Sequence, residues 1–339
     1  SYSNGIFKGI LFLVSDENYL MMELSDIQEA HQRIKDHVVK TPVMTSTTID
    51  AMTGCRVYFK CENFQRVGAF KFRGAYNTIS QLTAKEREKG VIAHSSGNHA
   101  QALALAAKML GVKATIVMPN NSPKVKVTAT RGYGAEIVFC ENSTESRASV
   151  ANDLVEKHGF TLVHPYNDHR IIAGAGTAAL ELIEEIGQLD YIFAPVGGGG
   201  FLSGTAIAAK GLCPNSKVIA VEPENADDAY RSFKAGKIFP SEYPNTIADG
   251  LRTQLGELTF EVIKKHVNDI ILVSEQEIVD AMRLYWERLK LVVEPSGAVS
   301  LAGLLKMSSN FTGSSIGVMI SGGNIDLTEF FEMYSKQII

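Results

Sequence analysis

The sequence predicts an α/β protein with two tightly apposed domains, each built on a twisted, largely parallel sheet flanked by helices. The main observation is that short β-like segments alternate with helical segments along most of the chain, as in sheets whose parallel strands are joined by crossover helices. This alternation occurs in two separate series, and no linker rich in Pro, Gly or Ser divides them. A length of 339 residues is enough for two hydrophobic cores.

A few separate elements are expected in the segment that precedes the first series. Residues 1–22 are expected to be an N-terminal extension of unknown role. A helix is expected from a capping box at Ser25–Gln28, because apolar residues follow it at helical spacing. A strand is expected at 57–60 and a further helix at 74–82.

The two series define the expected domains. The first has strand candidates at 91–94, 114–118 and 136–139 and helix candidates at 98–110, 124–133 and 145–157. The second has strand candidates at 191–196, 217–222, 270–273 and 316–321 and helix candidates at 201–212, 275–289 and 296–307. We therefore expect a large domain formed by residues 23–82 and 168–339 and a small domain formed by residues 83–167.

Composition narrows the function classes. A formal net charge of −4 and the absence of any long Lys/Arg cluster argue against a nucleic-acid partner. No stretch of the sequence approaches the roughly 20 apolar residues of a membrane span. The four cysteines, Cys55, Cys61, Cys140 and Cys213, are scattered and form no C-x-x-C pair, which is typical of reduced thiols. We expect a cytoplasmic protein with no membrane segment.

A run of four glycines, Gly197 to Gly200, follows a predicted strand and precedes a predicted helix. Without side chains, the backbone N–H groups can converge on an anion, and the helix N-terminus adds its positive end. The run lacks the Gly-Lys-Ser/Thr of a P-loop and the spacing of the dinucleotide motif, which also argues against an NAD-dependent oxidoreductase. The sequence predicts a phosphate site, and a flexible turn is the alternative.

Two further segments carry polar groups suited to chemistry. Lys71 stands between Phe70 and Phe72, and apolar surroundings lower the pKa of an amine and make it nucleophilic toward a carbonyl. A solvated surface lysine is the alternative. The segment Ser95-Ser-Gly-Asn-His99, at a predicted helix start, suits a substrate carboxylate, and an ordinary helix cap is the alternative.

In combination, these segments resemble the fold type II family of pyridoxal 5′-phosphate (PLP) enzymes, which includes serine and threonine dehydratases, tryptophan synthase β and serine racemases. The similarity is greatest to the eukaryotic serine racemases and runs from about residue 25 to about residue 327. It is carried by the phrases Lys60-Cys-Glu-Asn-Phe-Gln65, Ser95-Ser-Gly-Asn-His99, Thr246-Ile-Ala-Asp-Gly250 and Ile320-Ser-Gly-Gly-Asn324. One departure is Ala69, where the family often has Ser before Phe-Lys.

The resemblance implies roles for individual residues. PLP would be bound in the large domain by Lys71, Phe70, Asn98, Gly197, Gly198, Gly199, Gly200 and Ser321. Lys71 would hold it covalently, the glycines its phosphate, Asn98 its ring hydroxyl and Ser321 its pyridine nitrogen. A neutral Ser at that nitrogen makes a milder electron sink, which suits elimination or racemisation. The amino-acid substrate would be bound by Ser95, Ser96, Asn98, His99 and Asp249.

The catalytic residues implied by the resemblance are Lys71 and Ser96. Racemisation needs an acid/base on each face of the α-carbon, and Ser96 would serve the face opposite Lys71. We therefore expect interconversion of L- and D-serine, with accompanying β-elimination to pyruvate and ammonia. The alternatives are an L-serine/L-threonine dehydratase or a 3-hydroxyaspartate dehydratase, in which Ser96 only binds substrate. A non-catalytic PLP-binding protein would need neither Ser96 nor a metal.

Two further sites are implied by the resemblance. Glu222, Ala226 and Asp228 follow a predicted strand and match the metal loop of serine racemases, for Mg²⁺ or alternatively Ca²⁺ or Mn²⁺. A solvated acidic loop is the alternative. ATP as an allosteric activator, bound between the subunits of a homodimer, is implied by five matching positions, which are Ser46, Gln101, Tyr133, Lys290 and Asn324.

Overall fold

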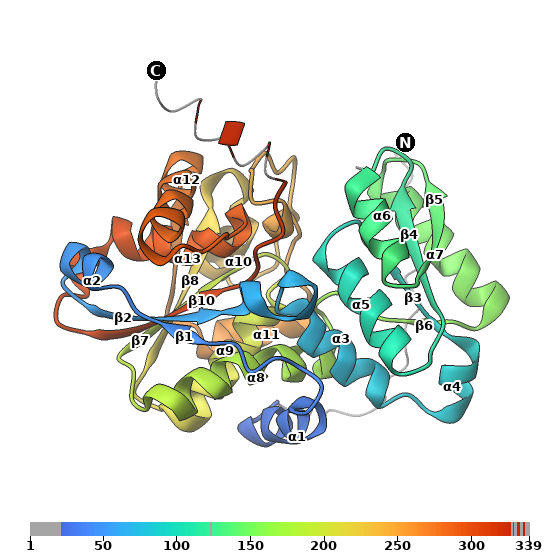
Figure 1. Cartoon of the computed structure of the whole chain (residues 1–339), viewed down its shortest axis with the longest axis horizontal. Helices are drawn as coiled ribbons and strands as arrows, with labels where there is room; N and C mark the ends of the chain where they lie inside the picture. The colour runs from blue at the N-terminus through green and yellow to red at the C-terminus, as the bar shows by residue number, and fades with distance from the viewer. Residues whose placement is uncertain (1–21, 123, 327, 329–330, 333–334, 336–339) are drawn as a thin grey trace, which may run out of the picture.

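A computed structural model describes residues 22–339 except 123, 327, 329, 330, 333, 334 and 336–339, so residues 1–21 of the expected extension lie outside the described residues (Figure 1). The described chain forms two sheets that lie side by side, each with its own helices (Figure 1). The predicted fold class is confirmed. The division into domains at residues 83 and 167 stays a prediction.

The larger sheet has six strands in the order β1-β2-β10-β7-β8-β9. All neighbouring strands are parallel except β1, which pairs antiparallel with β2. The strands are β1 Val43–Met44, β2 Arg56–Cys61, β10 Ser315–Ile320, β7 Tyr191–Pro195, β8 Lys217–Pro223 and β9 Asp269–Val273. The carboxyl ends of the parallel strands therefore share one edge, where ligands bind in open α/β sheets.

The smaller sheet has four parallel strands in the order β5-β4-β3-β6. They are β5 Glu136–Cys140, β4 Ala114–Pro119, β3 Val91–His94 and β6 Thr161–Leu162. Three of these match predicted strands within one residue at each end. The two-residue strand β6 is too short to produce a periodic pattern in the sequence.

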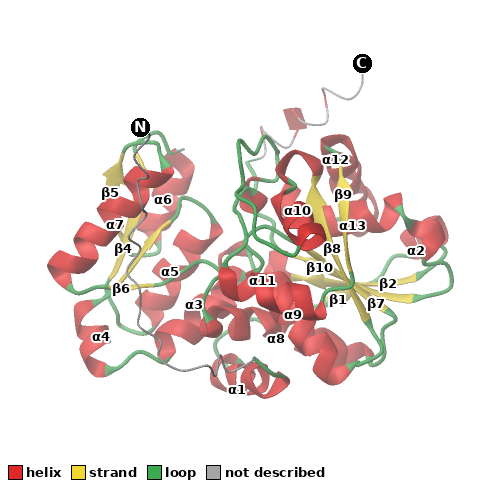
Figure 2. Cartoon of the chain, turned by 180° about the vertical axis from the view of Figure 1, so that it is seen from behind, coloured by secondary structure: helices red, strands yellow, loops and turns green. Residues whose placement is uncertain are grey.

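Helices cover both faces of the larger sheet. α12 and α13 lie on one face, and α8, α9 and α1 lie on the other (Figures 1 and 2). Their apolar faces form two separate clusters of buried side chains, one on each side of the sheet. The helices on the larger sheet and before it are α1 Leu24–Ile34, α2 Thr47–Thr53, α3 Lys71–Ser80, α8 His169–Ile186, α9 Gly200–Leu212, α10 Asp228–Ala235, α11 Glu257–His266, α12 Glu275–Leu284 and α13 Pro295–Lys306.

The helices beside the smaller sheet are α4 Ala84–Lys89, α5 Asn98–Met109, α6 Lys124–Gly132 and α7 Thr144–His158. None of the helices among the described residues has the length and apolarity that crossing a membrane would need.

The predicted starts of two helices are wrong. α1 begins at Leu24, because the capping box is formed by Glu23 and Asp26, whose carboxylate accepts from the Glu23 N–H at 2.7 Å. The predicted box at Ser25–Gln28 therefore lies inside the first turn. α3 begins at Lys71, three residues before the predicted start, so the lysine belongs to a helix rather than to a loop.

A buried charge cluster fixes the start of α3. The guanidinium of Arg73 donates to both carboxylate oxygens of Glu62 at 2.7 and 2.8 Å and to both of Glu181 at 2.8 Å. Lys60 donates to Glu181 at 2.7 Å. These contacts join α3 to β2 and α8. Because all four groups are buried, removing one would leave an uncompensated charge at a cost of about 3–5 kcal/mol.

Candidate active site

The segments predicted to carry chemistry converge at the carboxyl edge of the larger sheet. The residues before Lys71 pair with the loop after β10, since the Phe70 N–H donates to the Ser321 carbonyl at 3.0 Å and the Gly323 N–H to the Gly68 carbonyl at 2.9 Å. Two segments from opposite ends of the described chain thereby become neighbours. They hold Lys71 close to Ser321.

Lys71 is the first residue of α3, and its amine donates to the carbonyl of Pro165 at 2.7 Å. The nitrogen lies 5.1 Å from the centre of the Phe70 ring, which itself stacks on Phe201 at 4.1 Å. Burial lowers the pKa of Lys71 to about 8. A substantial fraction of the amine is therefore neutral near physiological pH, as a nucleophile toward a carbonyl requires.

The four glycines form a buried loop at the N-terminus of α9. A Cβ on Gly198 would lie 2.2 Å from the ring of Tyr166, and one on Gly197 would lie 2.9 Å from the Leu251 backbone. Gly199 has φ 91°, a left-handed conformation that favours glycine. A loop that excludes side chains and leads into a 13-residue helix has the features of a phosphate cradle. These residues fit the phosphate group of PLP.

The segment between β3 and α5 places Ser95 and Ser96, both half-buried, before the first turn of α5. The Gly97 N–H donates to the Ser95 hydroxyl at 3.3 Å. The N–H groups at the start of this 12-residue helix suit a carboxylate.

His99 is only 3% exposed, and its Nε2 lies 3.0 Å from the carbonyl of Val163. That contact assigns the proton to Nε2, so Nδ1, which has no partner among the described residues, is an acceptor. Burial and then the charge of Lys71 lower the pKa of His99 to about 3. A neutral ring with a free acceptor suits a substrate hydroxyl or ammonium group better than a carboxylate.

Asn98 belongs to a network that includes a residue not predicted from the sequence, Glu294. The Asn98 amide donates to Glu294 Oε1 at 2.9 Å, and the Asn324 amide donates to Asn98 Oδ1 at 2.9 Å. Burial and the charge of Asp249 raise the pKa of Glu294 to about 8. No motif marks this residue. Its only signal is a Glu-Pro pair at a helix start, where Glu294 is the N-cap of α13.

Asp249 lies in a short 3₁₀ turn, Asp249–Leu251. Its carboxylate accepts from Lys126, on α6, at 2.9 Å. The next residue, Gly250, packs against Gly197 and donates its N–H to the Ser296 hydroxyl at 3.1 Å. The ion pair therefore joins α6, beside the smaller sheet, to a turn beside the glycine loop.

The predicted metal residues form a buried acidic pair. The Glu222 carboxylate accepts from the N–H groups of Ala229 and Tyr230 at 2.9 and 2.8 Å. Asp228 is 1% exposed, and neither of its oxygens has a partner of good hydrogen-bond geometry among the described residues, although the Ser241 hydroxyl is close enough to lower its pKa. Burial raises the pKa of Asp228 to about 7 and that of Glu222 well above its usual value, the latter also through repulsion by Asp228. Two unneutralised carboxylates fit a hard cation.

The five predicted nucleotide residues do not meet within one chain. Ser46 caps α2, which lies at the opposite side of the molecule from α5 and α6 in both views (Figures 1 and 2). Gln101 is on α5, and Tyr133 follows α6. Lys290 has φ 62° and donates to the Glu287 carbonyl, whereas Asn324 contacts Asn98.

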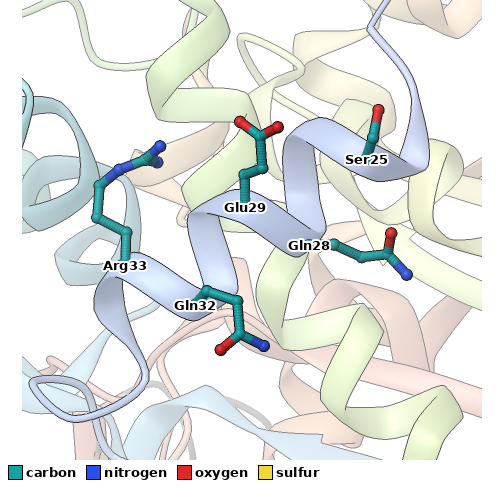
Figure 3. A pocket seen from close by; sticks show the side chains of 5 residues that line it. All are labelled: Ser25, Gln28, Glu29, Gln32 and Arg33. Carbon is teal, nitrogen blue, oxygen red and sulfur yellow. The ribbon is translucent and has the colours of Figure 1, made fainter.

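A surface hollow on α1 is separate from these sites. It is lined by Ser25, Gln28, Glu29, Gln32 and Arg33, which project from the polar face of the helix (Figure 3). It contains none of the predicted site residues and is a solvated helix face.

The Lys71 amine at the start of one helix and the glycine loop at the start of another would suit a cofactor that carries an aldehyde and a phosphate. The model of the pyridoxal-phosphate dependent enzyme family matches residues 34–322, and the chain belongs to that family.

Relatives and solved structures match over nearly the whole chain. The chain is 51% identical to an L-threo-3-hydroxyaspartate ammonia-lyase of Saccharomyces cerevisiae, over 91% of this chain and 95% of the relative. It is 50% identical to a serine racemase of Dictyostelium discoideum, whose crystal structure matches 91% of this chain and 100% of its own with a TM-score of 0.87. The structure of maize serine racemase is 47% identical and matches with a TM-score of 0.89, covering 94% of this chain and 98% of that one.

Proposed function

We propose that this chain interconverts L- and D-serine with PLP as its cofactor and also eliminates water from serine to give pyruvate and ammonia. The observation that carries the proposal is the amine of Lys71, whose pKa of about 8 lies near physiological pH, beside a glycine cradle at a helix N-terminus. The similarity to two serine racemases at 50% and 47% identity supports the choice of substrate.

PLP, when bound, withdraws electrons from the substrate α-carbon and so makes its proton acidic. Gly197 to Gly200 would hold the phosphate, Asn98 the ring hydroxyl and Ser321 the pyridine nitrogen. The N–H groups at the start of α5 and the hydroxyl of Ser95 would orient the substrate carboxylate. Lys71 would move the α-proton on one face, and Ser96 would move it on the other. The acceptor Nδ1 of His99 would take a substrate hydroxyl or ammonium proton.

A second candidate function is dehydration of 3-hydroxyaspartate to oxaloacetate and ammonia. It is favoured by the 51% identity to the ammonia-lyase of Saccharomyces cerevisiae. The same lysine would remove the α-proton, and the β-hydroxyl would leave as water. The two substrates differ in the second carboxylate of 3-hydroxyaspartate, which serine lacks.

We further propose a divalent cation, Mg²⁺ or alternatively Ca²⁺ or Mn²⁺, at Glu222 and Asp228 with the backbone carbonyl of Ala226. The support is the buried Asp228 carboxylate, whose oxygens lack well-aligned donors in the described part of the chain. A hard cation would neutralise both carboxylates.

ATP as an activator, a homodimer and a cytoplasmic location complete the proposal. Since α2, which Ser46 caps, lies on the opposite side of the molecule from α5 and α6, a nucleotide site shared by Ser46, Gln101 and Tyr133 would need residues from two subunits (Figure 1). A two-fold dimer is the assembly that would bring them together.

One experiment decides between the two functions. The chain is incubated with PLP, Mg²⁺ and L-serine, and D-serine and pyruvate are measured in the same tube. A parallel tube receives L-threo-3-hydroxyaspartate, and oxaloacetate is measured. D-serine with pyruvate supports the racemase. Oxaloacetate without D-serine supports the second candidate, and no product from either substrate would contradict both.

A further inference from the structure

Glu294 uses both carboxylate oxygens on groups at the candidate cofactor site. Oε1 accepts from the Asn98 amide at 2.9 Å, and Oε2 accepts from the backbone N–H of Asn324 at 3.1 Å. The residue is only 5% exposed. A carboxylate that is buried and accepts two hydrogen bonds from the site is placed to orient other groups.

The network leaves Asn98 one orientation. Its Oδ1 accepts from the Asn324 amide, and one hydrogen of its Nδ2 goes to Glu294. A flipped amide would place oxygen against the Glu294 oxygen and nitrogen against the Asn324 amide, and it would lose both bonds. The second hydrogen on Nδ2 therefore stays available in a fixed direction.

The neighbouring residues Gly322 and Asn324 allow and fix the contact between Glu294 and Asn98. A Cβ on Gly322 would lie 2.6 Å from Glu294 Oε1, so glycine is required for the carboxylate to lie where it does. The Asn324 amide gives its other hydrogen to the Val67 carbonyl at 2.6 Å, which fixes that side chain as well. The charged groups that influence Glu294 are Asp249 and Lys126, and these two form an ion pair with each other.

We propose that Glu294 is a positioning residue, which together with Asn324 clamps the Asn98 amide so that its free N–H faces the ring hydroxyl of PLP. This inference rests on the proposed function, because it takes from that proposal the contact between Asn98 and the ring hydroxyl. Glu294 acts through Asn98 and need not touch substrate or cofactor.

The test is Glu294→Gln, measured at pH 9, where a group with a pKa of about 8 is ionised. The substitution keeps the shape but offers one acceptor and one donor in place of two acceptors. Glutamine cannot satisfy Asn98 and the Asn324 N–H together. We expect the dissociation constant for PLP to rise about tenfold or more, as for loss of one hydrogen bond to a charged group. The visible absorbance of bound PLP should titrate at a different pH, because the ring hydroxyl has lost its fixed donor. Glu261→Gln, at an exposed position of α11, is the matched control and should leave both readouts unchanged.

A double-mutant cycle separates positioning from general damage. In an Asn98→Ala background, Glu294→Gln should change PLP binding by less than about twofold, because the clamp has nothing left to orient. If Glu294→Gln does not fold, Asn324→Ala removes the other half of the clamp at an exposed position and should also weaken PLP binding. If Glu294→Gln and the wild type have equal affinity for PLP and equal titration, the inference is overturned but the proposed function is not. The same holds if Glu294→Gln weakens PLP binding as much in the Asn98→Ala background as in the wild type. A wild-type chain that takes up no PLP would overturn the proposed function and this inference with it.

Discussion

The amine of Lys126 on α6 lies 2.9 Å from the carboxylate of Asp249, and this ion pair joins a helix of the smaller sheet to a turn beside the glycine loop. The two side chains are 34% and 52% exposed. Exposed pairs of this kind contribute about 0–1 kcal/mol to stability and are screened by salt. The pair is therefore suited to a contact that opens and closes.

Lys126→Met should raise the KM for the amino acid at low salt and reduce the salt dependence of that KM. The free energy of unfolding should change by less than about 1 kcal/mol. Steady-state kinetics at two salt concentrations check this. The matched control is Lys234→Met, which removes an exposed pair with Asp269 at 3.0 Å, between α10 and β9. The same KM change in both variants would rule out a specific role for Lys126.

Lys71→Ala should abolish the covalent attachment of PLP and all turnover, because the chain loses the amine of its proposed site. In the wild type, the rate of PLP attachment should rise with pH and level off above about 8, since the neutral amine is the reactive form and its pKa is about 8. Visible absorbance measures the attachment of PLP in the variant and the rate of attachment in the wild type, and pyruvate release measures turnover. Lys85→Ala on the exposed surface of α4 is the control, and turnover by Lys71→Ala without added amine would contradict the assignment.

Ser96→Ala should lower the conversion of L-serine to D-serine by at least about 10²-fold, the typical contribution of a positioned acid/base. Elimination from L-serine should survive in part, because Lys71 serves that face, whereas elimination from D-serine should collapse. Chiral chromatography and pyruvate release measure these rates. Equal losses with both enantiomers would mean that Ser96 only positions substrate, as expected for the neighbouring change Ser95→Ala.

Asp228→Asn should reduce but not remove a pH-dependent instability of the metal-free protein, because Glu222 keeps a pKa raised by burial. The pKa of Asp228 is about 7 when folded, against 3.8 for an ordinary Asp, so the folded state binds more protons than the unfolded state between these values. Stability of the metal-free wild type should therefore fall as pH rises through this range, by on the order of a few kcal/mol.

Mg²⁺ should restore stability to the wild type above pH 7 but not to Asp228→Asn, and a chelator should reverse the effect. Thermal unfolding with and without Mg²⁺ provides the measurement. An identical response of the two proteins to Mg²⁺ would contradict the proposed metal site.

The sequence predicts most of the strands because each is a short β-like segment that stands between helical segments. It does not predict α8, the central helix, because nearly all its sides are buried and glycines interrupt its pattern. Gly176 and Gly204 bring α8 and α9 so close that a Cβ on Gly204 would lie 2.5 Å from the Gly176 nitrogen. Close packing of this kind depends on a partner helix that local sequence does not reveal.

In the candidate site too, some residues can be predicted from local sequence and others cannot. Lys71 and the glycine loop are visible in the sequence because unusual residues stand in one local segment. Glu294 is not visible in the sequence, because its importance comes from contacts with Asn98 and Asn324. These two residues lie 196 and 30 positions away from it in the chain. Likewise, the sequence cannot show that the His99 proton lies on Nε2, since that depends on the Val163 carbonyl.

The place of β10 between β2 and β7 has a consequence for synthesis of the protein. β2 leaves the ribosome well before β10, so the larger sheet stays divided, with the edges of β2 and β7 uncovered, until β10 has emerged. Because Ser321 and the loop that pairs with Gly68 and Phe70 follow β10, the nascent chain cannot assemble the lysine side of the site either. Cofactor capture at Lys71 must then wait until β10 and the loop after it have emerged, and until then the uncovered edges of β2 and β7 are open to pairing with other strands.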